Sequence, residues 1–251
     1  MPNERLRNAV AAAGLTIDQL ARQVEVDPKT VERWITKDRL PHRRHRWAVA
    51  KLVANEETYL WPATADDVRT KSASEAEFIT LYPHRGAVPQ QLWDTLIDRA
   101  TDSIDMLVFA GLFLFDTHPD LDKQLTAKAR AGLKSRLLFG EPSSEVVRER
   151  GDEEGIGEGL AARIRTSIRY LRDVPKVPGC EVRLHETILY NSLYRFDDDL
   201  LVNMHVYGAP APQNPVMHLR RVPGGRLFDH YMSSFDSVWT QATPLAAHLE
   251  P

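Results

Sequence analysis

Hydroxyl, imidazole and carboxyl groups gather near residue 200 at spacings that suit ligand binding or nucleophilic chemistry. Two apolar stretches, 188–196 and 200–208, place such groups at alternate positions, with an acidic turn between them. Because successive side chains of a strand point to opposite faces, alternate residues share one face, and pairing of the two strands would bring them together. A packed sheet interior with satisfied hydroxyls would produce the same pattern. The predicted ligand-binding residues are Tyr190, Ser192, Asp197, His205 and Tyr207.

A second set of side chains, close to the N-terminus, has the types and spacing that suit contact with DNA. Val31, Trp34 and Ile35 recur at helical intervals and predict the buried face of a helix that begins at Asp27–Pro28. The opposite face then presents basic and polar groups that a major groove can meet. The basic run at 41–47 follows directly, where a backbone phosphate would pass. The predicted DNA contacts are Thr16, Pro28, Lys29, Thr30, Glu32, Arg33, Lys37, Arg43 and Arg44.

Two short helices joined by a tight turn must position this face. Their pattern is carried by Thr16, Leu20, Ala21, Val24, Val31 and Trp34. It resembles the helix-turn-helix of phage-repressor-like (XRE family) regulators, which implies sequence-specific binding to double-stranded DNA. Glu25 departs from the family pattern, which commonly has a small turn residue there, often glycine. Two packed helices that bind no DNA are the alternative interpretation.

Charge separates this N-terminal region from the rest of the chain. Residues 1–54 contain 11 lysines and arginines against 6 aspartates and glutamates, a net charge of +5. The whole chain carries −3, which leaves −8 for residues 55–251. The basic character is therefore confined to the region whose pattern indicates DNA binding.

The amino-acid composition narrows the classes of protein to which the chain can belong. With 251 residues, of which 43% are hydrophobic and 27% charged, the chain has the composition of a soluble protein with two domains. Its single cysteine, Cys180, excludes a disulfide framework and a cysteine-clustered zinc site, and fits a reducing cytoplasm. No signal peptide opens the sequence, and the apolar run at 106–115 is about half the length of a membrane span. We expect a cytoplasmic protein without membrane contact, metal or cofactor.

After the N-terminal helices the pattern changes to strands that alternate with helices. We predict a helix-turn-helix domain over 1–62, a polar, flexible linker over 63–76 and a larger domain over 77–251. In the larger domain, 103–115 reads as one long buried strand and 227–241 as a closing helix. The expected fold class is α + α/β, an all-α N-terminal domain followed by an α/β sandwich with a mixed sheet.

The order and spacing of these elements resemble one copy of the phospholipase D-like fold, over about 78–243. That family carries HxKxxxxD and then GSxN, and the resemblance implies a histidine that takes up a phosphoryl group and a lysine and asparagine that hold its oxygens. If Asp197 stands for the family aspartate, it is the one motif residue retained. The replacements are Tyr190 for histidine, Ser192 for lysine, and Met204, His205 and Tyr207 for glycine, serine and asparagine.

The replacements remove the family's chemistry. Without the lysine, the site lacks the electrostatic stabilisation that usually dominates phosphoryl transfer. His185 precedes the strand and is the other candidate nucleophile, but no lysine follows two residues later, and we predict a structural role for it. We therefore expect no catalytic residue and no enzyme.

A domain that keeps the place of the site but loses its chemistry, joined to a DNA-binding domain, predicts a sensor or dimerisation module. Archaeal sugar-responsive regulators resemble this arrangement at the level of fold. We expect a homodimeric transcriptional regulator that binds double-stranded DNA at two half-sites and responds to a small-molecule effector. Two alternatives are a DNA-targeted phosphodiesterase or nuclease and an antitoxin-like protein-interaction module.

Overall fold

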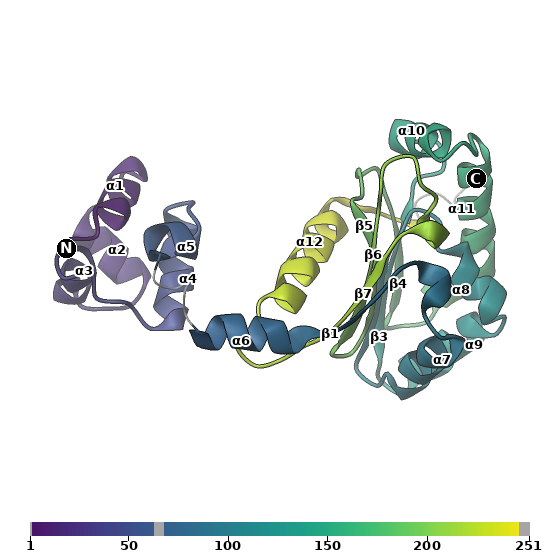
Figure 1. The fold of residues 1–251 in the computed structure, drawn as a ribbon, viewed down its shortest axis with the longest axis horizontal. Helices are drawn as coiled ribbons and strands as arrows, with labels where there is room; N and C mark the ends of the chain where they lie inside the picture. The colour runs from purple at the N-terminus through teal and green to yellow at the C-terminus, as the bar shows by residue number, and fades with distance from the viewer. Residues whose placement is uncertain (1, 63–67, 246–251) are drawn as a thin grey trace. The chain divides into compact units, whose positions relative to one another are not determined.

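Two compact units make up the chain, Met1–Ser72 and Ala73–Pro251 (Figure 1). The structure is a computed structural model that describes residues 2–62 and 68–245, with the backbone alone at 68–71. The flexible linker expected over 63–76 is corrected from Val68 onward, because α6 spans Val68–Glu77. Alanine, glutamate, lysine and arginine favour helices even where no apolar stripe marks one. The start of the expected linker, 63–67, lies outside the described residues.

Side-chain caps start both helices of the predicted helix-turn-helix. Thr16 and Gln19 form a reciprocal capping box at the first helix. At the second, Asp27 accepts a hydrogen bond from the Lys29 N–H at 2.8 Å, and Pro28 occupies the first helical position. The helices of this unit are α1 (Glu4–Ala12), α2 (Ile17–Gln23), α3 (Pro28–Thr36), α4 (Arg43–Leu52) and α5 (Glu57–Leu60).

The turn between α2 and α3 depends on Glu25. Its φ of 55° lies in the left-handed region, which costs an L residue about 1–2 kcal/mol and favours glycine. This strain explains why the position suits a small turn residue. Val31, Trp34 and Ile35 are buried as predicted, and they pack with Leu20 and other apolar side chains of α1, α2, α4 and α5.

The second unit alternates strands and helices, as the sequence predicts. Its strands are β1 (Phe78–Tyr82), β2 (Ser103–Leu107), β3 (Lys134–Gly140), β4 (Cys180–His185), β5 (Asn191–Phe196), β6 (Asp199–Met204), β7 (Val216–Arg220) and β8 (Thr243–Pro244). Its helices are α7 (Gln90–Arg99), α8 (Leu112–Thr117), α9 (Leu121–Arg130), α10 (Glu145–Glu153), α11 (Gly159–Tyr170) and α12 (Leu227–Gln241). Short 3₁₀ turns are η2 (Arg85–Ala87), η3 (Val174–Lys176) and η4 (Ala211–Gln213).

The described strands form one mixed sheet in the order β1-β7-β6-β5-β2-β3-β4-β8. The pairs β2–β3 and β3–β4 are parallel, whereas the other neighbours are antiparallel. Helix α12 lies on one face of the sheet, and α7, α8, α9 and α11 lie on the other (Figure 1). The predicted fold class, a helical N-terminal unit followed by an α/β unit with a mixed sheet, is therefore confirmed.

One predicted element is wrong. The apolar run over 103–115 is not a single strand, because β2 ends at Leu107 and α8 begins at Leu112. Gly111 makes the break with a φ of 61°. Both halves of the run are buried, so hydrophobicity alone could not separate a strand from a short buried helix. This break opens the space where the candidate site lies.

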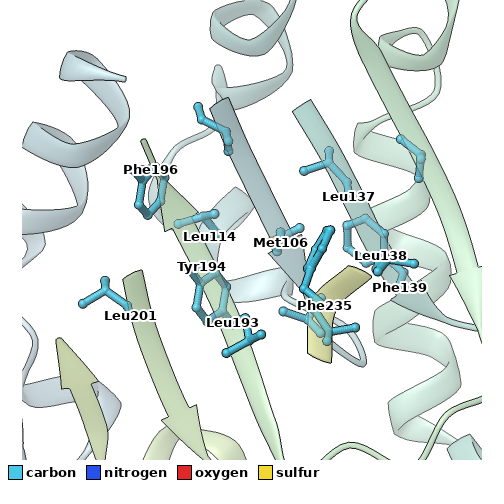
Figure 2. Packing of buried hydrophobic residues seen from close by; sticks show 14 of the residues in the cluster. Met106, Leu114, Leu137, Leu138, Phe139, Leu193, Tyr194, Phe196, Leu201 and Phe235 are labelled. Atoms are coloured by element: carbon cyan, nitrogen blue, oxygen red, sulfur yellow. The ribbon is translucent and has the colours of Figure 1, made fainter. Parts of the chain in front are cut away.

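Apolar side chains cover both faces of the sheet (Figure 2). Trp93 of α7 meets the rings of Tyr194 and Phe196 edge-on, with centroids 5.2 and 6.4 Å away. Phe235 of α12 packs on the opposite face with Trp239, and the two rings stack at 6.0 Å. Among the described residues, no helix combines the length and apolar character needed to cross a bilayer.

Candidate functional site

A cavity of about 320 Å³ opens where β2 gives way to α8, at the same edge as the start of β5 and the end of β6. Residues 108–113 form part of its wall, and Leu160 of α11 and residues 211–212 close other sides. Tyr194, whose side chain is buried, belongs to the lining. The other polar lining residues are Arg85, Asp116, Glu154, Arg163, Ser192 and His205.

The structure brings together two of the five predicted ligand-binding residues. Ser192 of β5 and His205, the residue that follows the end of β6, line the cavity. The expectation that all five line one cavity is wrong for Tyr190 and Tyr207, which are 80% and 89% exposed and do not line it. Both lie outside the strands, since β5 begins at Asn191 and β6 ends at Met204, so the alternation that predicts their direction no longer applies. Ligand binding by Ser192 and His205 stays a prediction.

Asp197 is the third correction, because it belongs to the opposite end of the β5–β6 hairpin. Its carboxylate accepts backbone hydrogen bonds from Thr101, Asp102 and Ser103 at 2.9, 2.9 and 2.8 Å. Burial raises the pKa of Asp197, but these three hydrogen bonds outweigh that effect and place the pKa below its usual value. The residue has a φ of 51° and ties the hairpin turn to the start of β2. Its role is structural.

Ser192 and His205 form a hydrogen-bonded pair whose proton positions follow from the neighbouring groups. Nδ1 of His205 lies 3.1 Å from the Leu189 carbonyl, which can only accept, so Nδ1 carries the proton. Nε2 then has a free lone pair and accepts from the Ser192 hydroxyl at 3.0 Å. The His205 ring also stacks on Phe109, with centroids 6.0 Å apart. The single hydroxyl proton of Ser192 is thus committed to His205.

Ser192 and His205 are arranged like a nucleophile and its general base, but His205 is too weakly basic for that role. Burial lowers the pKa of His205 to about 4, against the raising effect of the Leu189 carbonyl. A general base works best when its pKa lies near the working pH, so an imidazole this acidic takes up a serine proton poorly. A backbone carbonyl also replaces the carboxylate that stabilises an imidazolium in serine hydrolases. The pair therefore lacks both the basicity and the supporting carboxylate of a serine-hydrolase site.

His185, the other histidine weighed as a nucleophile, is closed off by backbone groups. Its Nε2 donates to the Val108 carbonyl at 3.0 Å, and its Nδ1 accepts from the Thr187 N–H at 3.2 Å. The side chain is buried, and burial lowers its pKa to about 4. With both ring nitrogens occupied, His185 has no lone pair for chemistry. These contacts support the structural role predicted for it.

Sequence reasoning missed Arg85 and Arg163, which bring positive charge to the cavity. Arg85 sits in η2 with its guanidinium carbon 3.9 Å from the centroid of the Phe113 ring. It also lies against the Tyr194 hydroxyl, whose pKa burial raises while Arg85 and Ser192 lower it. Arg163 projects from α11, an amphipathic helix in which an arginine gives no sign of a site. Neither position follows a motif in the sequence.

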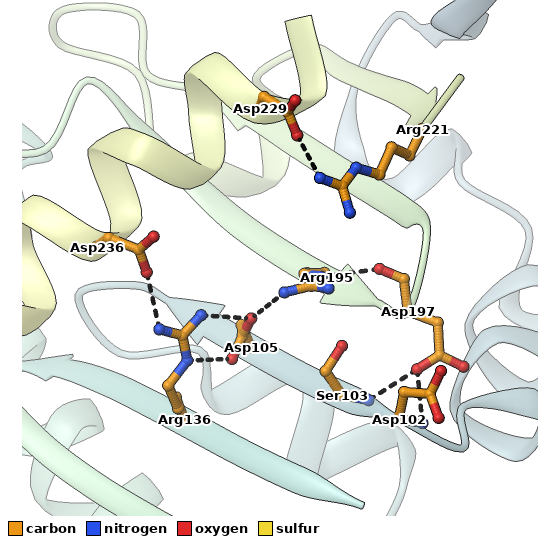
Figure 3. A network of polar contacts seen from close by, with 9 residues as sticks. All are labelled: Asp102, Ser103, Asp105, Arg136, Arg195, Asp197, Arg221, Asp229 and Asp236. Carbon is orange, nitrogen blue, oxygen red and sulfur yellow. Dashed lines mark hydrogen bonds and ion pairs between the residues drawn. The ribbon is translucent and has the colours of Figure 1, made fainter. Parts of the chain in front are cut away.

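A separate polar network lies on the α12 face of the sheet (Figure 3). Asp105 is buried and accepts two hydrogen bonds from Arg136, at 2.8 and 2.9 Å, and one from Arg195 at 3.0 Å. Arg136 also donates to Asp236 of α12 at 2.8 Å and lies over the ring of Phe235. The hydrogen bonds to Asp105 raise the pKa of Arg136. The charged side chains of Asp105, Arg136, Arg195 and Asp236 are therefore all paired. Among the described residues, no cluster of three potential ligands could hold a metal ion.

The predicted DNA contacts lie on the surface of the N-terminal unit. Lys29, Arg33 and Lys37 follow one another at four-residue spacing along α3 and its cap, and all three are exposed. Thr16 accepts a hydrogen bond as the α2 cap, which leaves its hydroxyl proton free to donate. The other exposed residues of the set are Glu32, Arg43 and Arg44, and the half-buried ones are Pro28 and Thr30.

One arginine of the basic run over 41–47 turns inward. Arg46 is buried and donates to the Pro41 carbonyl at 3.2 Å and to Glu57 at 3.4 Å. Helix α4 begins at Arg43, so most of the basic run belongs to the start of a helix. Arg43 and Arg44 therefore project from the first turn of α4, while Arg46 supports the fold.

Fold and geometry together define a two-part protein, with a small helical unit and an α/β unit that holds a polar cavity beside a mixed sheet. The chain belongs to the family described as "Domain of unknown function (DUF5919)", whose model matches residues 75–246. A comparison with curated proteins found no match.

The solved structures that resemble the chain include a chromatin protein and a phospholipase D family member. TrmBL2, described as an archaeal chromatin protein with a novel mode of DNA binding, is 14% identical, with a TM-score of 0.44 over 94% of this chain and 92% of that one. Nuc from Salmonella typhimurium, a phospholipase D family member, is 17% identical, with a TM-score of 0.35 over 62% of this chain and 89% of that one.

Proposed function

We propose that this chain is a sequence-specific DNA-binding transcriptional regulator that reads the major groove with α3, in the manner of XRE-type helix-turn-helix proteins. The observation that carries the proposal is the exposed stripe of Lys29, Arg33 and Lys37 on α3. None of the three forms a salt bridge with any residue that the structure describes. Because residues 1–54 carry a net charge of +5, this face offers phosphate contacts and side chains for base edges.

The C-terminal unit then serves as the responsive part rather than as an enzyme. The cavity at Ser192 and His205 has room for a small ligand, and its imidazole is too weak a base for efficient proton removal. A ligand changes DNA affinity only if it binds the DNA-competent and incompetent arrangements unequally. Turnover of bis(p-nitrophenyl) phosphate at high protein concentration, lost in Ser192→Ala, would instead favour the phosphodiesterase alternative.

Contacts at the end of α6 support this division of roles. Glu77 is buried and accepts hydrogen bonds from the N–H groups of Leu227 and Phe228, at 2.8 and 3.3 Å, at the start of α12. Gly225 leaves the room for it, since a Cβ there would come within 2.1 Å of the Glu77 carboxyl carbon. The boundary between the two compact units falls within α6. A shift of the start of α12 would therefore act, through Glu77, on the helix that contains the boundary between the units.

A homodimer completes the proposal, because a helix-turn-helix gains affinity when two copies occupy two half-sites. Apolar side chains beside the β5–β6 strand ends support it: Ile188, Tyr190, Val206 and Tyr207 are 60%, 80%, 50% and 89% exposed. Exposed apolar groups gathered in this way commonly mark interfaces. Analytical ultracentrifugation of the wild type and of Tyr190→Ser with Tyr207→Ser tests this, and a wild-type chain that stays monomeric at high concentration contradicts it.

The main experiment tests α3. Binding sites are enriched from a random duplex library with the full-length protein, and the affinity for the best site is measured by fluorescence anisotropy. Arg33→Ala is expected to weaken specific binding by about 1–3 kcal/mol, because it removes a base or phosphate contact. Arg7→Ala is the matched control, since it removes the same charge from α1, where Arg7 pairs only with the exposed Glu4. The control should change affinity by much less.

Two results would count against the proposal. The first is failure of the library to yield any enriched sequence. The second is equal loss of affinity in Arg33→Ala and Arg7→Ala, which would mean that binding depends on net charge and not on α3.

A further inference from the structure

The cavity holds charges that the protein itself does not neutralise. Arg85 and Arg163 form no salt bridge with the described residues, and neither does Asp116 at the same cavity. Glu154 differs, because its carboxylate pairs with the buried Arg150 at 2.8 Å. Arg150 also pairs with Glu153 at 2.7 Å, so the charges in and beside the cavity balance. What distinguishes Arg85 and Arg163 is that neither is paired with a carboxylate of the described residues.

Arg85 is also held in place for recognition. Its guanidinium lies over the Phe113 ring at 3.9 Å, and the half-buried side chain sits beside the Tyr194 hydroxyl. Stacking fixes the plane of the guanidinium and leaves its N–H donors directed from the edges, which is the geometry that recognises a carboxylate or phosphate. An immobilised arginine loses less side-chain entropy when it binds an anion.

The rest of the cavity presents acceptors. Ser192 gives its one proton to His205, whose own proton goes to the Leu189 carbonyl, so the Ser192 oxygen can meet a ligand only as an acceptor. The burial that lowers the pKa of His205 keeps the imidazole neutral, so the positive charge at the cavity comes from the arginines and not from His205. The Asp116 carboxylate is a further acceptor. A ligand that matches these groups must donate hydrogen bonds as well as carry negative charge.

We infer that the cavity binds a small organic anion that also carries hydroxyl or amino groups, with its acid group on Arg85 and Arg163 and its donors toward Ser192 and Asp116. A volume of about 320 Å³ suits a molecule of roughly the size of a monosaccharide acid. This inference rests on the proposed regulatory function, because it names the class of effector.

The test measures binding of matched probe pairs to the full-length protein by isothermal titration at constant ionic strength. The anionic probes are gluconate, glucose 6-phosphate and glutamate, and their neutral counterparts are sorbitol, glucose and glutamine. We expect at least one anion to bind tenfold or more tightly than its neutral counterpart. Arg85→Gln should weaken that binding about tenfold or more, and Arg85→Lys should restore part of it, since a lysine keeps the charge but not the planar fork.

Arg165→Gln is the matched control, because Arg165 is an exposed arginine on the same helix as Arg163, does not line the cavity and should leave binding unchanged. If Arg85→Gln fails to fold, Arg163→Gln takes its place. Equal binding of each anion and its neutral partner, loss of binding in Arg165→Gln to the same extent, or no Arg85-dependent binding of any probe would each overturn the inference.

The outcome is separable from that of the regulatory proposal. Binding of the probes is measured without DNA, and the affinity of the same variants for the enriched duplex is measured without probe. An Arg85→Gln protein that binds DNA normally but no anion confirms the cavity's ligand class and leaves the function of α3 untouched. If the protein binds an anion but no DNA, the proposed regulatory function is wrong and the proposed anion site stands.

Discussion

The two polar clusters of the α/β unit differ in how their charges are satisfied. On the α12 face, Asp105, Arg136 and Arg195 neutralise one another, and Asp236 completes the set (Figure 3). On the other face, Arg85 and Arg163 line a cavity with no carboxylate bonded to them among the described residues. We call the paired set of Asp105, Arg136, Arg195 and Asp236 the closed cluster and the unpaired Arg85 and Arg163 the open cluster. Burying a charge is costly unless it is paired, so the closed cluster stabilises the fold. The open cluster is tolerated only where water or a ligand can enter.

The closed cluster also shows how the sheet is joined to α12. Arg136 reaches from β3 to Asp236 on α12 and lies over the Phe235 and Trp239 rings of that helix, at 4.6 and 5.7 Å. One guanidinium therefore serves as an ion-pair partner, a hydrogen-bond donor and a packing surface. Nothing in the open cluster is held by as many contacts. The comparison predicts that substitutions in the first cluster change stability, whereas those in the second change binding.

The largest expected effect comes from Asp105→Asn. The substitution keeps the shape but leaves Arg136 and Arg195 without their buried counter-charge, which should lower the free energy of unfolding by about 3–5 kcal/mol. Urea denaturation measures this. Asp229→Asn is the matched control, because Asp229 pairs with Arg221 on the surface, where both side chains are 51% exposed, and an exposed pair contributes about 0–1 kcal/mol. Similar losses in the two variants would refute the structural role of the closed cluster.

The second prediction concerns acid stability and the two buried histidines. Burial depresses the folded pKa of both His185 and His205 to about 4, below an unfolded value near 6.5. Between those values the unfolded chain binds protons that the folded chain does not, so stability is complete above pH 6.5 and falls as the pH drops toward 4. Each histidine should contribute a slope of about 1.4 kcal/mol per pH unit near pH 5. Urea titrations from pH 7 to 4 measure it.

His205→Gln separates the contribution of the cavity histidine, His205, from that of His185. At pH 5 the variant should take up about one proton fewer than the wild type when it unfolds. The dependence of its unfolding free energy on pH should therefore be smaller by about 1.4 kcal/mol per pH unit. The contribution of His185, which is bonded to backbone groups on both ring nitrogens, should remain. An unchanged slope would mean that His205 is already protonated in the folded protein, and that it cannot accept from Ser192.

A smaller effect is expected at Asp197, the residue that the sequence places in the site and the structure places in a turn. Asp197→Asn tolerates the positive φ but presents a weaker, uncharged acceptor to the Thr101, Asp102 and Ser103 N–H groups, for a loss of about 1–2 kcal/mol. Because the folded pKa is depressed, this stabilisation is present above the unfolded pKa near 4 and is lost as the pH falls through the folded value. Asp198→Asn, at the exposed neighbour, should change little in urea denaturation at pH 7. Anion binding should survive in both variants, and its loss in Asp197→Asn would return this residue to the site.

Local chemistry explains which parts of the fold the sequence predicts. The cap at Thr16, the Asp27–Pro28 helix start and the buried stripe of α3 depend on neighbours within one or two helical turns, and all appear in the structure. Helix α12 likewise spans the predicted 227–241. The prediction of one strand over 103–115 is wrong because a buried strand and a short buried helix have the same composition, and Gly111 marks the change between β2 and α8.

The candidate site was harder to predict because its parts are distant in the sequence. Pairing of β5 with β6 brings the strand ends together, so that His205, one residue after β6, bonds to Ser192 of β5. Alternation holds only inside a strand, so it fixes the direction neither of His205 nor of Tyr190, one residue before β5, and Tyr190 is exposed. Arg85 reaches the cavity because η2 follows β1, and β1 pairs with β7 at one edge of the sheet. That placement depends on long-range topology, for which a single sequence holds no local pattern.

The smallest expected effect on stability belongs to Arg85→Gln, and it is the sharpest test of the comparison. Arg85 stacks on Phe113 and touches Tyr194 but neutralises no carboxylate, so its loss should change the free energy of unfolding by about 0.5–2 kcal/mol, the range of a half-buried cation–π contact. In the presence of a bound organic anion the wild type should gain stability, because a ligand that binds only the folded state shifts unfolding, and the variant should gain much less. Urea denaturation with and without gluconate or glucose 6-phosphate measures both quantities on one sample. A loss of several kcal/mol without any ligand would show that Arg85 supports the fold as Asp105 does, and the distinction between a closed and an open cluster would fail.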